Sequence, residues 1–336
     1  MHRLHSEEAA NLPDCGADPI ASLKNMFIDR VQRPRALDGQ CPVRRPVFTK
    51  AHGSAKATFE VHPSVPPEER IGVFAHPKLD AWIRFSSDTK PGLGDLKSTI
   101  GIGIKLFDVP GPKLLDGEED ALTADFILQN HDVFFVDTAK DMCEFTYAGV
   151  VLHDYDSYLN DHEETAKILD EMEKEVLSVV GIEYWSCLPY AFGNKYVKYK
   201  LRPLEITVLP PIPPNNPNYL RDELKQRLLK GPVRYELCLQ FQKDEQSMPI
   251  NRATVRWDEK VSVPRPFATI TLHQQDIDDP GQMAYAENLS YNPWHTLAVH
   301  RPAGSISEAR KVVYQAGAAQ RRQRNGIPNC EPTVAR

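Results

Sequence analysis

Residues 195–201, Lys-Tyr-Val-Lys-Tyr-Lys-Leu, alternate charged and apolar side chains. Successive side chains of a β-strand point to opposite faces of its sheet, so this alternation predicts an antiparallel strand with one face in water. The heptapeptide overlaps the fifth of seven strand-like runs in the sequence. These runs lie at 57–61, 81–86, 100–107, 125–135, 196–205, 233–242 and 267–273. Few helical patterns separate the early runs, and the sequence therefore predicts an antiparallel β-barrel or a strongly curved sheet.

Helical patterns are fewer, and they lie at 20–31, 139–150, 163–180, 219–229 and 306–324. In the third of them, apolar residues recur at helical spacing and predict a packed stripe formed by Ile168, Leu169, Met172, Val176 and Val180. Together the two patterns predict an α+β fold, with an antiparallel β-barrel core and surrounding α-helices.

Composition sets limits on the kind of protein. The chain has 336 residues, 40 basic and 46 acidic side chains, and a formal charge of −6. No run approaches the roughly 18 apolar residues of a membrane span, and residues 1–12 lack the apolar centre of a secretory signal. This pattern predicts a cytoplasmic protein without the electrostatic footprint that nucleic-acid binding requires. Prolines cluster at 61–67 and 209–217, between the periodic segments.

Six cysteines are present, at positions 15, 41, 143, 187, 238 and 330. No two of them have the C-x-x-C spacing of a zinc site or a thiol-exchange motif. A chain of this length builds a core without covalent cross-links. The sequence therefore predicts six unrelated thiols, mostly reduced, and no disulfide framework.

The last helical segment places Arg310, Tyr314 and Arg321 on one face, because both arginines fall within about 40° of the tyrosine at 100° per residue. Ser305 and Glu308 have the spacing of a capping box at the helix start. Positive charge favours the phenolate form of a tyrosine, and a phenolate is a hard anionic ligand for ferric iron. The alternative is a solvated arginine-rich surface.

Several segments in the same order resemble the catalase superfamily, in particular its short haem proteins that lack the extra C-terminal domain. They are Trp82-Ile-Arg-Phe-Ser86, Gly101-Ile-Gly-Ile-Lys105-Leu-Phe107, Asp125-Phe-Ile-Leu-Gln-Asn-His-Asp-Val-Phe-Phe135, Tyr196-Val-Lys-Tyr199, Val255-Arg-Trp257 with its flanks, Leu289-Ser-Tyr-Asn-Pro-Trp-His295 with His300-Arg-Pro302, and Arg310-x-x-x-Tyr314 followed by Arg321. The similarity predicts an N-terminal arm and helix over 1–44 and a haem-binding domain over 45–330.

The resemblance implies a barrel that holds haem b, iron protoporphyrin IX, above a proximal tyrosinate. Tyr314 is then the axial ligand and the metal ligand, with Arg310 as its hydrogen-bonding partner. Arg84 and Arg321 become partners of the haem propionates. The remaining family positions, Phe134 and Phe135, pack against the porphyrin or fill the barrel. Gly101 and Gly103 suit the close approach of something flat.

On the distal side, the family places a histidine that moves a proton between peroxide oxygens. The corresponding stretch, Arg45-Pro-Val-Phe48-Thr-Lys50, has phenylalanine at that position, and His52 follows four residues later. In a regular strand these two residues face the same way about 13 Å apart. A bulge near residues 51–54 brings His52 over the iron, with Ser86 as its partner; otherwise Phe48 caps a drier pocket.

The amide side chain that orients the peroxide in the family also has two candidate residues in this sequence. Gln129 takes the family's usual position, whereas Asn130 has the usual residue type. Only one of two neighbouring strand residues points inward, and Asn130 is slightly favoured.

Three functions remain open at this stage. The first is a haem-dependent oxidoreductase, a peroxidase acting on H2O2 or organic hydroperoxides with a small-molecule reductant, with weak or no catalase activity and with His52 as acid and base. The second is a hydroperoxide lyase or isomerase of the allene-oxide-synthase type, which needs no distal base. The third is a non-catalytic haem carrier or sensor. Larger relatives are tetramers, so a homo-oligomer is also expected.

Overall fold

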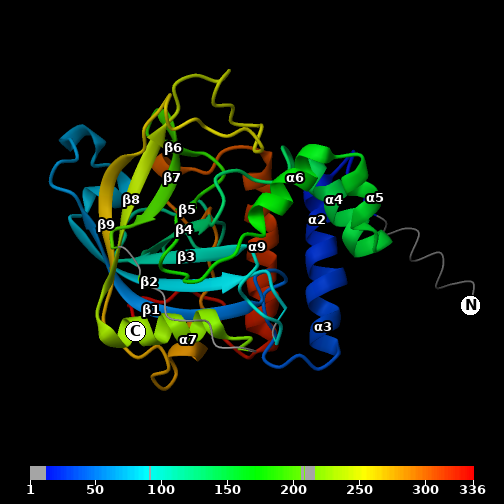
Figure 1. The fold of residues 1–336 in the computed structure, drawn as a ribbon, viewed down its shortest axis with the longest axis horizontal. Coiled ribbons are helices and arrows are strands. Elements are labelled where there is room, and N and C mark those ends of the chain that lie inside the picture. The colour runs from blue at the N-terminus through cyan, green and yellow to red at the C-terminus, as the bar shows by residue number, and fades with distance from the viewer. Residues whose placement is uncertain (1–12, 91, 206–207, 209–215) are drawn as a thin grey trace, which may run out of the picture.

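The computed structural model describes residues 13–90, 92–205, 208 and 216–336. A barrel of strands occupies one side of the molecule and a group of helices the other (Figure 1). The strands within the described part are β1 Lys50–Val61, β2 Lys78–Ser87, β3 Ile100–Phe107, β4 Thr123–Gln129, β5 Tyr184–Trp185, β6 Tyr190–Phe192, β7 Lys195–Pro203, β8 Val233–Phe241 and β9 Arg265–Leu272.

Every strand pair in the sheet is antiparallel, in the order β5-β4-β3-β2-β1-β9-β8-β7-β6. A further pairing of Tyr184 with Leu201 joins β5 to β7 and closes the sheet into a barrel. The barrel interior is a continuous apolar core that includes Phe59, Ile104 and Leu237. The predicted fold class is therefore confirmed.

The outer face of β7 differs from the prediction of a wet surface. Lys198 and Lys200 are buried, at 3% and 8% exposure. The ammonium of Lys198 lies 5.1 Å from the centre of the Trp257 ring, and that of Lys200 lies 5.1 Å from Trp185. Alternation along the strand identified the two faces, but other segments of this chain cover the charged one.

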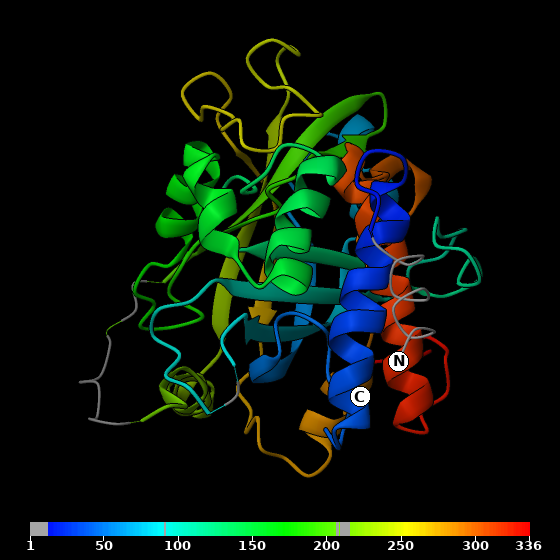
Figure 2. The same cartoon turned by 90° about the vertical axis from the view of Figure 1, so that its right-hand side faces the viewer.

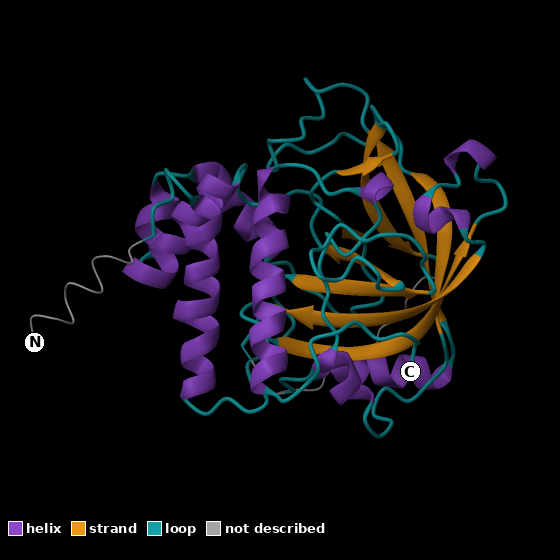
Figure 3. Cartoon of the chain, turned by 180° about the vertical axis from the view of Figure 1, so that it is seen from behind, coloured by secondary structure: helices purple, strands orange, loops and turns teal. Residues whose placement is uncertain are grey.

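Helices lie beside the barrel and across one end of it. They are α2 Pro19–Lys24, η1 Asn25–Gln32, α3 Arg33–Leu37, α4 Ala139–Tyr147, η4 Ala148–Leu152, α5 Tyr155–Asn160, α6 Glu163–Met172, α7 Tyr219–Lys230, α8 Gln282–Asn288 and α9 Ser305–Arg324, with short 3₁₀ turns at η2 Pro67–Glu69, η3 Gly72–Ala75 and η5 Ala298–His300. The first three run on from one another, and we call residues 19–37 the N-terminal helix. It lies beside α9, which separates it from the barrel (Figures 1, 2 and 3).

Two predicted elements are shorter in the structure. The helix predicted over 163–180 ends at Met172, and Val176 and Val180 instead pack in the barrel core. The backbone amide of Val176 donates to Leu96 O, so this residue belongs to a loop contact. The strand predicted over 125–135 ends at Gln129. Beyond it, the Asn130 side chain accepts a hydrogen bond from the backbone amide of Ile100.

The predicted capping box of α9 is also absent. Gly304 is the N-cap, and Ser305 is the first helical residue. The Ser305 hydroxyl oxygen accepts a hydrogen bond from the backbone amide of Ala139, which ties the start of α9 to the start of α4.

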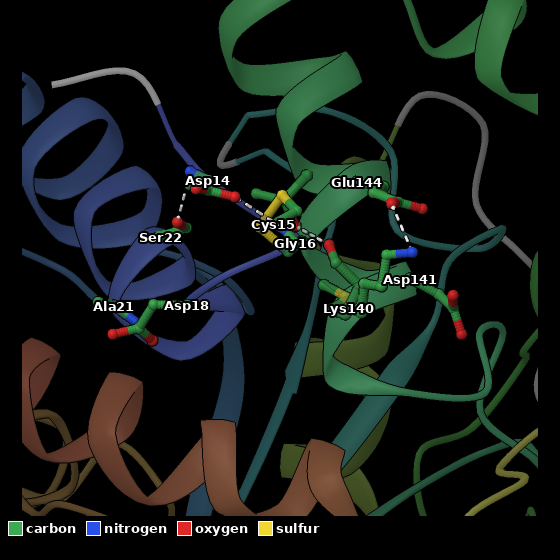
Figure 4. Close-up of a disulfide and its surroundings, with 12 residues drawn as sticks. Asp14, Cys15, Gly16, Asp18, Ala21, Ser22, Lys140, Asp141 and Glu144 are labelled. Carbon is green, nitrogen blue, oxygen red and sulfur yellow. Dashed lines mark hydrogen bonds and ion pairs between the residues drawn. A yellow bond between two sulfur atoms is a disulfide. The ribbon is translucent and has the colours of Figure 1, made fainter. Parts of the chain in front are cut away.

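The prediction of unconnected thiols is wrong for one pair. Cys15 and Cys143 form a disulfide between residues 128 positions apart, with Cα atoms separated by 5.5 Å (Figure 4). Spacing in the sequence carries no signal for such a distant pair. Among the described residues, the free cysteines are Cys41, Cys187, Cys238 and Cys330.

In the part of the chain that the structure describes, no helix has the length and apolar character needed to cross a bilayer. Residues 209–215 of the proline-rich stretch lie outside the described residues, as do residues 1–12.

Candidate functional site

A cavity of about 470 Å³ lies between the barrel wall and the helices. Its size is within the range of pockets that bind cofactors and small molecules. One wall comes from β2, β3 and β4, and another from α9, α4 and the N-terminal helix. At one end lie arginines, and at the other end apolar side chains that include Phe135, Met142, Phe145, Leu169 and Met172.

Tyr314 and Arg310 line the cavity from the same face of α9, one helical turn apart. The guanidinium carbon of Arg310 lies 5.1 Å from the centre of the Tyr314 ring. Although burial opposes the charge of Arg310, its electrostatic interactions with Tyr314 and Tyr190 raise the pKa of Arg310. A positively charged guanidinium therefore lies against the Tyr314 ring within the cavity.

Three arginines, Arg45, Arg84 and Arg321, meet around Glu287 at the polar end of the cavity. Arg84 Nη2 lies 3.1 Å from Glu287 Oε1, and Arg45 Nη1 lies 3.1 Å from Glu287 Oε2. Arg321 donates to the backbone oxygens of Glu287 and Leu289. The charges of Arg84 and Arg45 outweigh the effect of burial and lower the pKa of Glu287 to about 2. We call these four residues the arginine cradle.

The cradle carries an excess of positive charge. Burial, together with repulsion from Arg84 and Arg321, lowers the pKa of Arg45 well below its usual range. Three guanidinium groups against one carboxylate leave a formal excess of two positive charges when all four are ionised. Within the described residues, the buried Arg321 Nε has no hydrogen-bond partner. The cradle thus matches a ligand with two carboxylates.

The glycines of β3 do admit flat groups, but these are the chain's own rings. A Cβ atom on Gly101 would lie 2.9 Å from Phe48 Cε1, and one on Gly103 would lie 2.9 Å from Tyr291 Cδ1. Phe48 and Tyr291 both line the cavity. The absence of side chains at the two glycines lets these rings lie against the barrel wall.

Phe48 has a strained backbone. Its φ of 53° is in the left-handed region that bulky residues rarely adopt. Its carbonyl oxygen accepts a hydrogen bond from Arg84 Nη2 at 3.4 Å, which links its position to the cradle. Cys187, which also lines the cavity, has a φ of 58°. Such strain persists where the surroundings hold it, and it concentrates at functional sites.

His52 lies outside the residues that line the cavity. The anticipated bulge is present, between Ala51 and Gly53, but it does not bring His52 to the site. The imidazole is fully buried, and its Nδ1 lies 3.5 Å from Asp95 Oδ2. Burial lowers the pKa of His52. Ser86, its expected partner, lines the cavity instead.

The two neighbouring amides are also separated. Gln129 lines the cavity, and its buried Nε2 has no hydrogen-bond partner among the described residues. Asn130 is 3% exposed and lies outside the cavity lining, with its oxygen used by the backbone amide of Ile100. Gln129 lies at the cavity and Asn130 does not, because Phe126 and Leu128 of β4 face the barrel core and the alternate residue Gln129 faces the cavity.

Phe134 and Phe135 line the cavity with ring centres 4.6 Å apart. Phe135 also contacts Phe145 of α4, with ring centres 4.9 Å apart. The structure therefore brings together nine of the predicted residues around one cavity, namely Phe48, Arg84, Ser86, Gln129, Phe134, Phe135, Arg310, Tyr314 and Arg321. His52 and Asn130 are not among them.

Sequence reasoning missed other residues of the site. Arg45 belongs to the stretch around Phe48, and its charge was the available signal. Glu287 gives no local signal, because α8 brings it to the cradle from a distant part of the chain. The same holds for Tyr190, which interacts electrostatically with Arg310 and whose pKa burial raises to about 12.

No family model matches the chain, and no curated protein matches it significantly in sequence. Solved structures do match: a fungal catalase at 17% identity and catalase A from Saccharomyces cerevisiae at 16%, each with a TM-score of 0.67 over 87% of this chain. The alignment covers 63% of each of those chains, so this chain spans less than two thirds of their length. At this identity the likeness shows the fold.

Proposed function

We propose that this chain, which has a catalase-like fold, binds haem b in the cavity and acts on organic hydroperoxides. The observation that carries the proposal is the joint placement of Tyr314, Arg310 and the arginine cradle around one cavity. A tyrosinate-ligated haem supplies the redox chemistry that cleaves an O–O bond.

The residues present fit this cofactor. Tyr314 offers an oxygen ligand, and the positively charged guanidinium of Arg310 lies 5.1 Å from the centre of the Tyr314 ring. The two propionates of haem b match the excess charge of the cradle, with Arg84 and Arg321 as donors. Apolar groups, including Phe134 and Phe135, provide the packing surface for a porphyrin.

The distal residues favour a hydroperoxide over dismutation of H2O2. Dismutation needs a group that accepts a proton from one peroxide oxygen and returns it to the other. Phe48 lines the cavity where that group is expected, and a phenyl ring neither accepts nor donates a proton. The free amide hydrogens of Gln129 are available to orient a peroxide oxygen. The apolar end of the cavity suits the hydrocarbon part of an organic hydroperoxide.

A second candidate is a hydroperoxide lyase or isomerase. The presence of Phe48 in the cavity lining also favours this function. Rearrangement of a hydroperoxide needs no group that shuttles a proton, so a phenyl ring at this position is compatible with it. Peroxidase activity requires a small-molecule reductant, whereas isomerisation does not. Incubation with a fatty-acid hydroperoxide, with and without a reducing dye, separates the two: oxidised dye and an alcohol indicate a peroxidase, and a rearranged lipid without dye oxidation indicates an isomerase.

Haem binding is tested by Tyr314→Phe, which keeps the ring and removes the ligating oxygen. Titration of the purified chain with haem should give one equivalent bound and a Soret band that changes in the variant. Tyr155→Phe is the matched control, since Tyr155 also lines the cavity but lies at its apolar end, and its spectrum should equal that of the wild type. An unchanged spectrum in Tyr314→Phe would contradict the axial assignment.

A homo-oligomer and a cytoplasmic location are proposals of the same kind. Gel filtration and cell fractionation test them directly.

A further inference from the structure

The N-terminal helix is fastened to α4 by a covalent bond. Cys15 lies in a turn directly before the helix, and Asp14 orders that turn, because its Oδ1 accepts hydrogen bonds from the backbone amides of Gly16 and Ala17 (Figure 4). The backbone amide of Asp14 donates to Ser22 Oγ at 2.9 Å, which binds the turn to the helix it precedes. Through the disulfide, this whole unit is held to Cys143 in the middle of α4.

Both of the joined elements form the wall of the cavity. Leu23 and Phe27 line it from the N-terminal helix, and Met142 and Thr146 line it from α4, on either side of Cys143. Cys143 is itself fully buried in an apolar cluster with Leu23, Met26, Ala139, Ala309 and Val313, against which Tyr314 packs. The disulfide therefore joins two elements of the cavity wall next to the cluster against which Tyr314 packs.

The other end of the N-terminal helix is held without a covalent bond. Gln32 Nε2 donates to Arg44 O at 2.9 Å and to Gly317 O at 3.1 Å, and Arg35 donates to Pro46 O at 3.0 Å. Gly317 of α9 lies against this part of the N-terminal helix, since a Cβ there would be in ordinary contact with Ile28 Cδ1 at 3.4 Å. The wall thus has one end held by hydrogen bonds and close packing, and one end held by the disulfide together with the apolar cluster around Cys143.

We propose that the Cys15–Cys143 disulfide is a redox-sensitive latch on the cavity. A thiolate of a dithiol reductant attacks Sγ of Cys15, which is the less buried of the two cysteines, breaks the S–S bond and releases Cys143, which takes up a proton. The second thiol of the reductant then displaces Cys15 as a thiol and leaves as the oxidised, disulfide form. Two electrons and two protons pass to the protein. The N-terminal helix then opens about its anchored end, near Gln32, and the cavity exchanges its contents with solvent.

The test uses the full chain, oxidised and after dithiothreitol, in two measurements that need no haem. Hydrogen exchange follows the amides of residues 19–32, and stopped-flow fluorescence follows binding of anilinonaphthalene sulfonate, an apolar anion suited to a cavity with guanidinium groups. Cys15→Ser provides a form without the bond that leaves the buried Cys143 in place. Cys41→Ser is the matched control, because Cys41 is free and exposed.

Reduction should raise amide exchange in 19–32 and the dye association rate by about tenfold, while the barrel strands stay protected. Cys15→Ser should show the faster rates without reductant, and Cys41→Ser should behave as the wild type. The proposal is overturned by equal rates in both redox states, by loss of protection throughout the barrel, or by free Cys15 and Cys143 thiols in the purified protein. None of these outcomes depends on haem binding.

Discussion

Glu287→Gln gives the sharpest energetic test of the arginine cradle. The substitution keeps the size of the side chain and removes the one carboxylate that holds Arg84 and Arg45 together. The neighbouring arginines lower the pKa of Glu287 from its usual 4.5 to about 2. Because each pKa unit is worth about 1.4 kcal/mol, this carboxylate stabilises the folded chain by about 3 kcal/mol at neutral pH.

The pH dependence follows from the sign of that shift. The pKa of Glu287 is lower in the folded chain than in the unfolded one, so its stabilisation is complete above about pH 5 and is lost as the pH falls toward 2. Urea unfolding of the chain without added porphyrin should therefore show a wild-type advantage of about 3 kcal/mol at pH 7 that narrows through the acid range.

The matched control is Glu308→Gln, which removes an exposed carboxylate 3.7 Å from Arg301 on the surface of α9. Surface pairs contribute about 0–1 kcal/mol, so this variant should unfold nearly as the wild type does. Equal stability of wild type and Glu287→Gln at pH 7, or a difference that does not change with pH, would refute the charge balance assigned to the cradle.

Three further predictions concern the cavity and its supports. Phe48→His should increase H2O2 dismutation by the haem-loaded chain at least about tenfold, because histidine tolerates the left-handed backbone at this position and supplies a proton acceptor. An unchanged oxygen yield would contradict the placement of residue 48 beside the bound peroxide. His52→Ala should lower the midpoint of thermal unfolding and leave hydroperoxide turnover per bound haem unchanged, because His52 lies outside the cavity lining. A loss of turnover would show that His52 takes part in the reaction. Glu331→Gln should destabilise the chain by about 3–5 kcal/mol in urea unfolding, because buried Arg322 and Lys105 lose a shared carboxylate; a change below about 1 kcal/mol contradicts it.

Much of the fold could be predicted from periodicity. The seven predicted runs overlap β1–β4 and β7–β9, and the bounds of β3 at residues 100 and 107 match the prediction, whereas the short strands β5 and β6 were not predicted. The 100° spacing of a helix sufficed to place Arg310, Tyr314 and Arg321 together on α9. Local pattern determines these features, since strand and helix geometry depend mainly on neighbouring residues.

Other features depend on contacts that local pattern does not contain. The bulge beside His52 was foreseen, but the position of the imidazole, 3.5 Å from Asp95, involves a residue 43 positions away. Glu287 reaches the cradle only because α8 packs against β1. The same limit explains the unpredicted Cys15–Cys143 pair, which joins segments 128 residues apart. Tertiary packing decides all three.

The disulfide also bears on the predicted cytoplasmic location, which remains a prediction. Disulfides of most cytosolic proteins are transient and redox-responsive, whereas those of secreted proteins persist. Alkylation of the thiols in intact cells, followed by mass spectrometry of the Cys15 and Cys143 peptides, measures the fraction oxidised. A mixed population that shifts with the redox state of the cell agrees with both the location and the latch, and full oxidation under all conditions disagrees with them.

A crystal structure of the chain loaded with haem tests the central claim most directly. We predict the oxygen of Tyr314 bonded to iron, the ring of Phe48 facing the opposite side of the porphyrin, and the propionates within hydrogen-bonding distance of Arg84 and Arg321. Iron bound by any other residue, or a porphyrin outside this cavity, would contradict the account.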